Sequence, residues 1–515
     1  MKRNLLKAIG ISFLIFVILS WIIPVGTYTN GELTTNGIDA VGIFDLFGIP
    51  ISTLLVFATY IIAFAVIGGL YGVMSKTGAL DKLVEKLSGK FTGKEKVFLV
   101  ITVIFYVVAS SVTGLIVPLF VLVPISAMVL FKFGYDKITA LASTVGALLL
   151  GSAASTLGFN ISGYTKNLLA LDMTNQIVAK IVLLVIITIA LVFFVLKFSK
   201  RTEKKAEPAK IETKAKKVEK VEPKKASTKT TKKVAKKTTK KTATRKTTKK
   251  ATQAMAMAKS VKKVDTKKSV SIIPLIVIFA LLLIVSFIGM YNWYYAFDIN
   301  VFNDLYDSIM DIKIGDFPIF EHLFSGISQM GYWGNTEFAI LMIIAAIVLA
   351  WIYRLKLNAF VEAFIAGVKK MLPTAIYAGL ASVILYVLYQ ASYTGTGTFV
   401  DTMFAKTFGL TDDFNVVTTA ITALYGSFFY NDLYYLLVDM SSYLTSFDAS
   451  ALSVAGLLIQ SVYAVGMLIF PTSVILVAGL SFFDVSFKQW FKYIWKFALL
   501  VFLIIVLVCC ILTLL

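Results

Sequence analysis

Long apolar runs dominate this chain and restrict what it can fold into. Each of seven runs is long enough to cross a hydrocarbon core about 30 Å thick: 5–25, 51–75, 176–198, 271–291, 336–353, 373–393 and 488–515. Charged residues make up only 15% of the chain, against about 25% in soluble domains. These features exclude a soluble enzyme and predict an all-α polytopic membrane protein.

The first apolar run follows two basic residues, as it would in a signal peptide. No small-residue cleavage pattern comes after it, because the chain continues Trp-Ile-Ile-Pro-Val-Gly over residues 21–26. We therefore expect an uncleaved first membrane helix.

The net charge of +21 is confined to one insert. Residues 200–268 hold 27 Lys/Arg and 6 Asp/Glu, so the rest of the chain is balanced. The Lys/Thr/Ala-rich composition cannot bury enough apolar surface to offset ordering entropy, and we expect the insert 199–269 to be disordered. We interpret it as a cytoplasmic linker attracted to anionic lipid. Nucleic acid is not the expected partner, since no aromatic residues interleave with the lysines.

Residues suited to metals or cofactors are scarce. The one histidine, His322, falls in a predicted loop, and Cys509 and Cys510 are adjacent within the last apolar run. Neither a zinc nor a haem site is expected from this set. No phosphate-binding GxxxxGK[ST] loop is present, and no convergent nucleophile, base and metal-ligand set indicates an enzyme. We expect no cofactor other than Na⁺ or H⁺ as a coupling ion.

Three further apolar regions are interrupted by polar or Gly/Pro clusters, namely 96–131, 139–173 and 414–482. Backbone groups at membrane depth need partners, so such breaks are tolerated only against protein or a water-filled cavity. Interrupted segments in corresponding positions of two halves indicate the binding site of a transporter. We therefore interpret the breaks as the site.

The two halves of the chain share one order of features. After the span 51–75 comes T-G-A-L-D-K-L-V-E-K-L, and after 373–393 comes T-G-T-F-V-D-T-M-F-A-K. Both predict amphipathic helices at the membrane surface. Two polar breaks follow in each half: S-S-V-T-G and S-A-A-S-T-L-G-F-N in the first, G-S-F-F-Y-N-D and residues 461–473 in the second.

The distribution of lysine and arginine predicts the topology. It places the N-terminus, the first surface helix and the insert in the cytoplasm, and the C-terminus outside. Residues 96–131 and 414–443 then become re-entrant hairpins, and 139–173 and 451–482 broken transmembrane helices. With about nine full spans, the predicted order is a first helix and extracellular loop (1–50), repeat 1 (51–198), the insert (199–269), connecting helices with an extracellular loop (270–372), and an inverted repeat 2 (373–515).

Three stretches resemble a known family: V-P-L-F-V-L-V-P-I-S-A-M-V-L-F-K-F-G-Y-D-K-I-T-A-L-A at 117–142, F-V-E-A-F-I-A-G-V-K-K-M-L at 360–372, and F-P-T-S-V-I-L-V-A-G-L-S-F-F-D-V-S-F-K-Q-W-F-K at 470–492. They are similar to the YfcC-type anaerobic dicarboxylate carrier and amino-acid antiporter family of the ion transporter superfamily. The resemblance implies that 360–372 is a surface helix. It also implies a dimer, and a sodium- or proton-linked carrier or exchanger of small carboxylates or amino acids.

The chain departs from that family at the breaks. Ser110, Ser111, Val112 and Thr113 stand where the family has an acidic pair before a threonine. Residues 430–434 replace a Pro-Ser-Gly-Ser-Gly run, and residues 461–466 lack a Gly-Asp-Gly. The family's substrate therefore does not transfer directly to this chain.

Small hydroxyl and amide side chains at the breaks form the predicted substrate- or ion-binding set, because they donate and accept hydrogen bonds without a fixed charge. In repeat 1 they are Ser110, Ser111, Thr113, Ser152, Ser155, Thr156 and Asn160; in repeat 2 they are Ser427, Asn431, Asp432, Gln460, Ser461, Thr472 and Ser473. The alternative is that each Ser or Thr bonds only to a preceding turn or a neighbouring helix.

Asp432 is the most specific candidate, because an intramembrane carboxylate is costly and marks function by default. It would bind an ammonium group, Na⁺ or a proton, unless the hairpin tip is shallow and exposes it to water. Lys166 is either its charge partner or, as we favour, snorkels to the interface. Asp439 is placed in the second arm of the hairpin. Aromatic residues 291, 293, 294, 295 and 297 are interpreted as an interfacial belt.

These observations favour a secondary active transporter of a small organic anion or amino acid in the cell membrane. One alternative is an antiporter of basic amino acids. Another is a non-transporting scaffold that acts through its Lys-rich insert.

Overall fold

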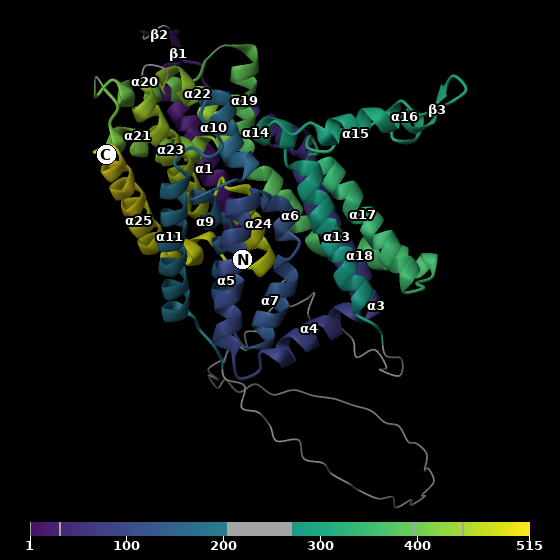
Figure 1. The fold of residues 1–515 in the computed structure, drawn as a ribbon. Coiled ribbons are helices and arrows are strands. Elements are labelled where there is room, and N and C mark those ends of the chain that lie inside the picture. Colours follow the sequence, from purple (N-terminus) through teal and green to yellow (C-terminus); the bar gives the residue numbers. More distant parts are fainter. Residues whose placement is uncertain are drawn as a thin grey trace, which may run out of the picture. The chain divides into compact units, whose positions relative to one another are not determined.

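The computed structural model describes residues 2–29, 32–202, 270–395, 397–411, 413–444 and 447–514. Within these ranges eight helices are long and apolar enough to cross a membrane, or nine if one bent pair counts as a span. Strands form only two short hairpins, β1 (Gly26–Thr29) with β2 (Glu32–Thr35) and β3 (Lys313–Ile314) with β4 (Phe317–Pro318). The predicted all-α polytopic fold is confirmed (Figure 1). The predicted disorder of the insert concerns residues that lie outside the described ranges, apart from its first few.

The helices before the insert are α1 (Lys2–Ile22), α2 (Asp45–Val56), α3 (Ala58–Thr77), α4 (Ala79–Lys90), α5 (Glu95–Thr113), α6 (Ile116–Phe120), α7 (Val123–Lys132), α8 (Lys137–Leu141), the π-helical turn η1 (Ala142–Gly146), α9 (Ala147–Ala153), the π-helical turn η2 (Phe159–Gly163), α10 (Tyr164–Leu169) and α11 (Ile177–Phe198). Those after it are α13 (Ile273–Met290), α14 (Trp293–Phe297), α15 (Val301–Met310), α16 (Ile319–Leu323), α17 (Asn335–Ile352), α18 (Leu357–Leu380), α19 (Val383–Thr394), α20 (Phe399–Phe408), α21 (Val416–Phe429), α22 (Leu433–Leu444), α23 (Ala449–Ile469), α24 (Val474–Phe483) and α25 (Phe487–Leu512).

Glycine allows helices α3 and α18 to pack more extensively than any other helix pair in the described part of the chain. A Cβ atom on Gly72 would overlap the carbonyl oxygen of Ala363, and one on Gly367 would overlap the carbonyl oxygen of Gly68. Small residues permit this approach where lipid supplies no hydrophobic driving force between helices. Helix α17 packs on α3, and α13 packs on α17 (Figure 1).

The prediction that residues 360–372 form a surface helix is wrong. These residues form the first part of α18, which continues through Pro373 to Leu380. Their small residues Ala363 and Gly367 are buried against α3 rather than exposed at an interface. Helix α18 then bends by 41° into α19, so the span expected at 373–393 is divided between two helices.

Repeat 1 contains a helical hairpin and an interrupted helix where the polar breaks predicted them. Helix α5 ends at Gly114 with a φ of +68°, and α6 and α7 return toward the beginning of α5. Both ends of the hairpin meet Arg201, which pairs with Glu95 at 3.1 Å and bridges to Tyr135. The second helix runs from α8 to α9, breaks at 154–158, and resumes at η2 and α10.

Repeat 2 contains the same two features. Helices α21 and α22 form a hairpin whose tip is 430–432, and α23 and α24 are separated by the break 470–473. Helix α20, which precedes the hairpin, begins with a capping box between Thr398 and Asp401. It corresponds to the second amphipathic helix expected from the sequence.

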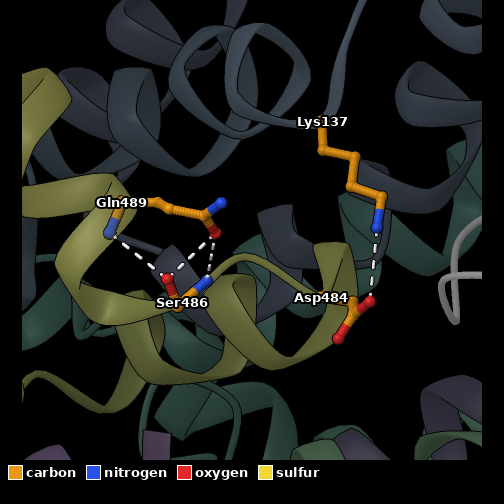
Figure 2. Close-up of polar contacts among 4 residues, drawn as sticks. All are labelled: Lys137, Asp484, Ser486 and Gln489. Atoms are coloured by element: carbon orange, nitrogen blue, oxygen red, sulfur yellow. Dashed lines mark hydrogen bonds and ion pairs between the residues drawn. The ribbon is translucent and has the colours of Figure 1, made fainter. Parts of the chain in front are cut away.

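The two interrupted helices are tied together away from their breaks. Lys137 at the start of α8 pairs with Asp484 at the end of α24 at 3.3 Å (Figure 2). Ser486 and Gln489 form the capping box that begins α25 (Figure 2). The indole nitrogen of Trp490 donates to the carbonyl of Leu468 at 2.9 Å. The ion pair joins the interrupted helix of repeat 1 to that of repeat 2, and the Trp490 bond holds α25 to α23 within repeat 2.

Candidate functional site

All four breaks meet at one cavity of about 320 Å³. Gly114 and Ile116 come from the first hairpin, and Ser152 and Asn160 from the first interrupted helix. The second hairpin and the second interrupted helix complete these walls with Asn431, Asp432, Leu433, Tyr463, Met467, Ser473, Val474 and Ile475. The cavity therefore combines chain segments that are more than 300 residues apart.

Five of the fourteen predicted site residues line this cavity: Ser152, Asn160, Asn431, Asp432 and Ser473. Sequence reasoning missed a further wall formed by the beginning of α3, the end of α13 and the residues that lead into α17. This wall consists of Tyr60, Met290, Trp333, Gly334 and Asn335. These residues stand at helix ends without a polar break in the sequence, so no pattern distinguishes them from interfacial residues.

Three helices of ten or more residues begin at the cavity. Leu433, Val474 and Asn335 are the first residues of α22, α24 and α17, and each lines the wall. The first amides of a helix lack partners within the helix and carry partial positive charge. Among the residues that the structure describes, no Lys, Arg or His side chain lines the cavity. The partial positive charge that the wall offers an anion therefore comes from backbone amides, and Asp432 caps one of them at the start of α22.

Asp432 lies in this wall as the last of the three residues of the hairpin tip. Its carboxylate accepts a hydrogen bond from the backbone amide of Tyr434 at 3.0 Å and so caps the start of α22. It has no ion pair within the described residues. Lys166, considered above as a partner, instead directs its ammonium toward the carbonyl of Ala296 at 3.5 Å.

Asn431 ties three elements together at the tip of the second hairpin. Its amide nitrogen donates to the carbonyl of Thr472 at 2.7 Å, in the break of the second interrupted helix. It also lies 3.3 Å from the carbonyl of Ala381 and 3.2 Å from Ser382 Oγ, at the bend between α18 and α19. The backbone carbonyl of Asn431 accepts from the hydroxyl of Tyr463 at 2.8 Å. Asn431 therefore positions the tip.

The first hairpin is held to its interrupted helix by predicted residues that do not line the cavity. Ser111 Oγ donates to the carbonyl of Ala154 at 2.6 Å, and its own carbonyl accepts from the amide of Thr156 at 3.0 Å. Ser155 Oγ also donates to the carbonyl of Ser111. Thr113 bonds back to the preceding turn at Ala109. These residues therefore follow the alternative given above, in which each Ser or Thr bonds to a preceding turn or a neighbouring helix.

In repeat 2, Ser461 and Ser427 also form structural contacts. Ser461 Oγ donates to the carbonyl of Ala153 at 2.5 Å and thereby joins the two interrupted helices. Ser427 bonds back to Leu424. Ser473 accepts from the amide of Leu476 and caps α24 while it lines the cavity.

Three predicted residues are buried with side-chain atoms that have no hydrogen-bond partner among the described residues. They are Ser110, Gln460 and Thr472. Buried polar atoms are normally paired with protein or ordered water. These three residues therefore mark places next to the breaks where the protein interior is polar.

The aromatic residues after α13 do not form a uniform interfacial belt. Tyr291 is buried, and its hydroxyl donates to the carbonyl of Leu157 in the first break, so the belt interpretation is wrong for this residue. Tyr294 and Tyr295 are exposed, as an interfacial position requires.

His322 lies at the exposed end of the short helix α16 rather than in a loop. Asp439 lies in the second hairpin arm and accepts from the hydroxyl of Tyr430 at 2.5 Å.

Membrane-length helices arranged around a cavity at four helix breaks are typical of membrane carriers. Over residues 5–514 the sequence matches the DcuC family, described as C4-dicarboxylate anaerobic carrier, and the chain belongs to that family. This membership confirms the anaerobic dicarboxylate carrier class expected from the sequence, whereas the YfcC-type and antiporter details stay predictions.

One solved structure is similar to the chain, but more weakly than the family is. The crystal structure of the Alcanivorax borkumensis YdaH transporter, described as having an unusual topology, is similar over 97% of this chain and 96% of its own, at 12% identity and a TM-score of 0.32. No curated protein sequence matches the chain.

Proposed function

We propose that the chain is a secondary active transporter of a small dicarboxylate, which binds in the cavity at the four breaks. The observation that carries this proposal is the start of three helices at that cavity without a basic side chain in its wall. Helix N-termini are ready-made sites for carboxylates. The C4-dicarboxylate description of the family supports the same substrate class.

Helix α24 provides the most suitable amides for a carboxylate. Val474 and Ile475 occupy its first turn and both line the cavity. The capping side chain of Ser473 accepts from Leu476, one residue further along. Since the first amides of a helix have no intrahelical acceptor, those of Val474 and Ile475 are available to an anion.

The proposed transport cycle uses the two repeats as inverted halves. The hairpins and interrupted helices carry the site, while α3, α13, α17 and α18 form the supporting part. In this proposal the hairpins are re-entrant, the protein spans the cell membrane as a homodimer, and the N-terminus and insert face the cytoplasm while the C-terminus faces outside. Na⁺ or H⁺ drives the cycle.

Asp432 favours a second candidate function, the exchange of amino acids. Its carboxylate lines the cavity, and no cationic side chain pairs with it among the described residues. An amino group of a substrate would supply the missing counter-charge. A basic amino acid would place its second cationic group in the same polar wall.

Thermal unfolding of the detergent-purified protein separates these functions. Succinate, fumarate, butyrate, arginine and lysine are each added in NaCl and in choline chloride. A ligand at 100 times its dissociation constant stabilises the native state by about 2.7 kcal/mol. Succinate or fumarate is expected to raise the melting temperature, and butyrate, which has one carboxylate, to do so less. Stabilisation by arginine or lysine alone would overturn the dicarboxylate proposal.

Two variants test whether Asp432 is responsible for the change in melting temperature. Asp432→Asn is expected to keep or strengthen succinate binding, because it removes a like charge, and would abolish binding of an amino acid. Asp448→Asn is the matched control, since Asp448 caps α23 away from the cavity. The scaffold alternative is tested by deletion of 203–265, after which uptake of succinate into proteoliposomes is expected to continue.

A further inference from the structure

Lys180 is a buried cation on an otherwise apolar helix face. Its side chain is 1% exposed and continues the buried stripe that Leu183, Ile187, Leu191 and Val195 form along α11. This stripe faces the first hairpin and the first interrupted helix. A lysine that only snorkelled would direct its ammonium outward to the interface. The ammonium of Lys180 points into the protein instead.

The contacts of Lys180 contain no counter-ion. Its ammonium lies 3.3 Å from Ser162 Oγ, and the two ion pairs of the described residues involve other groups. The elements packed against α11 carry several titratable groups, namely Glu95, Lys96 and Tyr106 on α5, and Lys488, Lys492, Tyr493, Lys496, Cys509 and Cys510 on α25. Helix α10, which follows the turn that holds Ser162, carries Tyr164 and Lys166. None of them bonds to Lys180. Burial of an unpaired charge costs free energy, so an ionised Lys180 requires an anion.

A chain of hydrogen bonds connects Lys180 to the breaks of repeat 1. Ser162 donates to the carbonyl of Ser155 at 3.2 Å, within the break of the first interrupted helix. Ser155 donates to the carbonyl of Ser111 at 3.3 Å, near the tip of the first hairpin. Asn160 and Ile161, which immediately precede Ser162, line the cavity. An interrupted helix exposes carbonyl oxygens that suit a cation. The ammonium of Lys180 reaches this break through the hydroxyl of Ser162.

We propose that Lys180 is the proton-binding group that couples transport: it is neutral in the empty carrier and protonated when a dicarboxylate occupies the cavity. The Nζ lone pair takes a proton from water on the side where the anion enters and returns it to water on the side where the anion leaves. A proton thus accompanies the anion, and Na⁺ is not required. This inference rests on the proposed function and specifies its coupling ion.

Proton uptake on binding of succinate tests the proposal. The purified full-length protein is held in weakly buffered detergent solution at a pH where succinate is a dianion, and a pH-indicator dye is followed while calorimetry measures binding. The wild-type protein is expected to take up about one proton for each succinate bound, in NaCl and in choline chloride alike.

Lys180→Arg carries a permanent charge, so it is expected to bind succinate with no proton uptake and with an affinity that no longer depends on pH. Lys180→Met, which extends the apolar stripe, is expected to lose both the uptake and most of the affinity. Lys166→Met is the matched control and is expected to retain the uptake, because the ammonium of Lys166 is directed to the carbonyl of Ala296 and not to the hydrogen-bond chain through Ser162. Folding of each variant is checked by its melting temperature without ligand.

The possible failures are distinguishable. If the wild-type protein does not bind succinate, the proposed dicarboxylate function is overturned, and the role of Lys180 with it. If succinate binds without proton uptake, if Lys180→Arg retains the uptake, or if binding requires Na⁺, only the role of Lys180 is overturned.

Discussion

Replacement of Asn431 by alanine would release the tip of the second hairpin from both elements that its side chain holds. The variant loses the 2.7 Å hydrogen bond to the carbonyl of Thr472 and the two longer contacts to Ala381 and Ser382. The hydrogen bond from Tyr463 remains, because it ends on the backbone carbonyl of residue 431. The variant therefore isolates the contribution of the side-chain amide.

The size of the effect follows from these contacts. The short bond contributes about 1 kcal/mol and the two longer ones about 0.5 kcal/mol each, so the closed tip loses about 2 kcal/mol. Since 1.4 kcal/mol corresponds to a factor of ten, local opening becomes about 30-fold more frequent. Hydrogen exchange measured on peptides that cover residues 430–434 should accelerate by about the same factor.

Asn160→Ala provides the comparison for this experiment. Asn160 also lines the cavity, but its amide has a single contact, at 3.5 Å from the carbonyl of Gly114. In the Asn160→Ala variant we expect the rate of hydrogen exchange around residue 160 to change by less than a factor of about three. Unchanged exchange at 430–434 in Asn431→Ala, combined with loss of succinate binding, would refute the positioning role and assign Asn431 to direct ligand contact.

Further predictions concern the supporting helices and the contacts of α4, α8 and α24. Gly367→Leu should lower stability by about 3 kcal/mol, measured as melting temperature in detergent, because no Cβ fits against α3. Burial, with the charge of Glu85, raises the pKa of Asp81 from 3.8 to about 6. Ionisation therefore penalises the folded state as pH rises from about 4 to 6, and Asp81→Asn should be more stable by about 1 kcal/mol at pH 7 but equal at pH 4, once solvent screening is included. A double-mutant cycle on Lys137 and Asp484 should give a coupling of about 0.5–1 kcal/mol that decreases with salt.

The breaks themselves were predictable because each interrupts an apolar run with polar residues, and the structure brings all four to one cavity. The identity of the lining side chains was not predictable. Ser111 and Ser152 are the same residue type at neighbouring breaks. Ser111 bonds to the backbone of the interrupted helix away from the cavity, whereas Ser152 lines the cavity while its hydroxyl bonds back to the carbonyl of Leu149. A hydroxyl serves either purpose, and only the packing decides between them.

Two other features show why local patterns fail here. The small residues of 360–372 recur three and four positions apart, which is also a pattern of an amphipathic surface helix. They instead accommodate α3, a partner almost 300 residues away in sequence. Lys180 follows only three residues after the start of its apolar helix, where a lysine ordinarily reaches the interface. Its inward direction depends on Ser162, which the sequence places on another helix.

The contacts among Lys137, Asp484, Ser461 and Ala153 fasten the interrupted helices of the two repeats at more than one level. Segments joined in this way are expected to be displaced as one body. A pair of spin labels on α8 and α24 would then report a constant separation in every state of the cycle. A pair on α18 and α24, which are in contact but belong to different parts of the proposed cycle, would record the displacement.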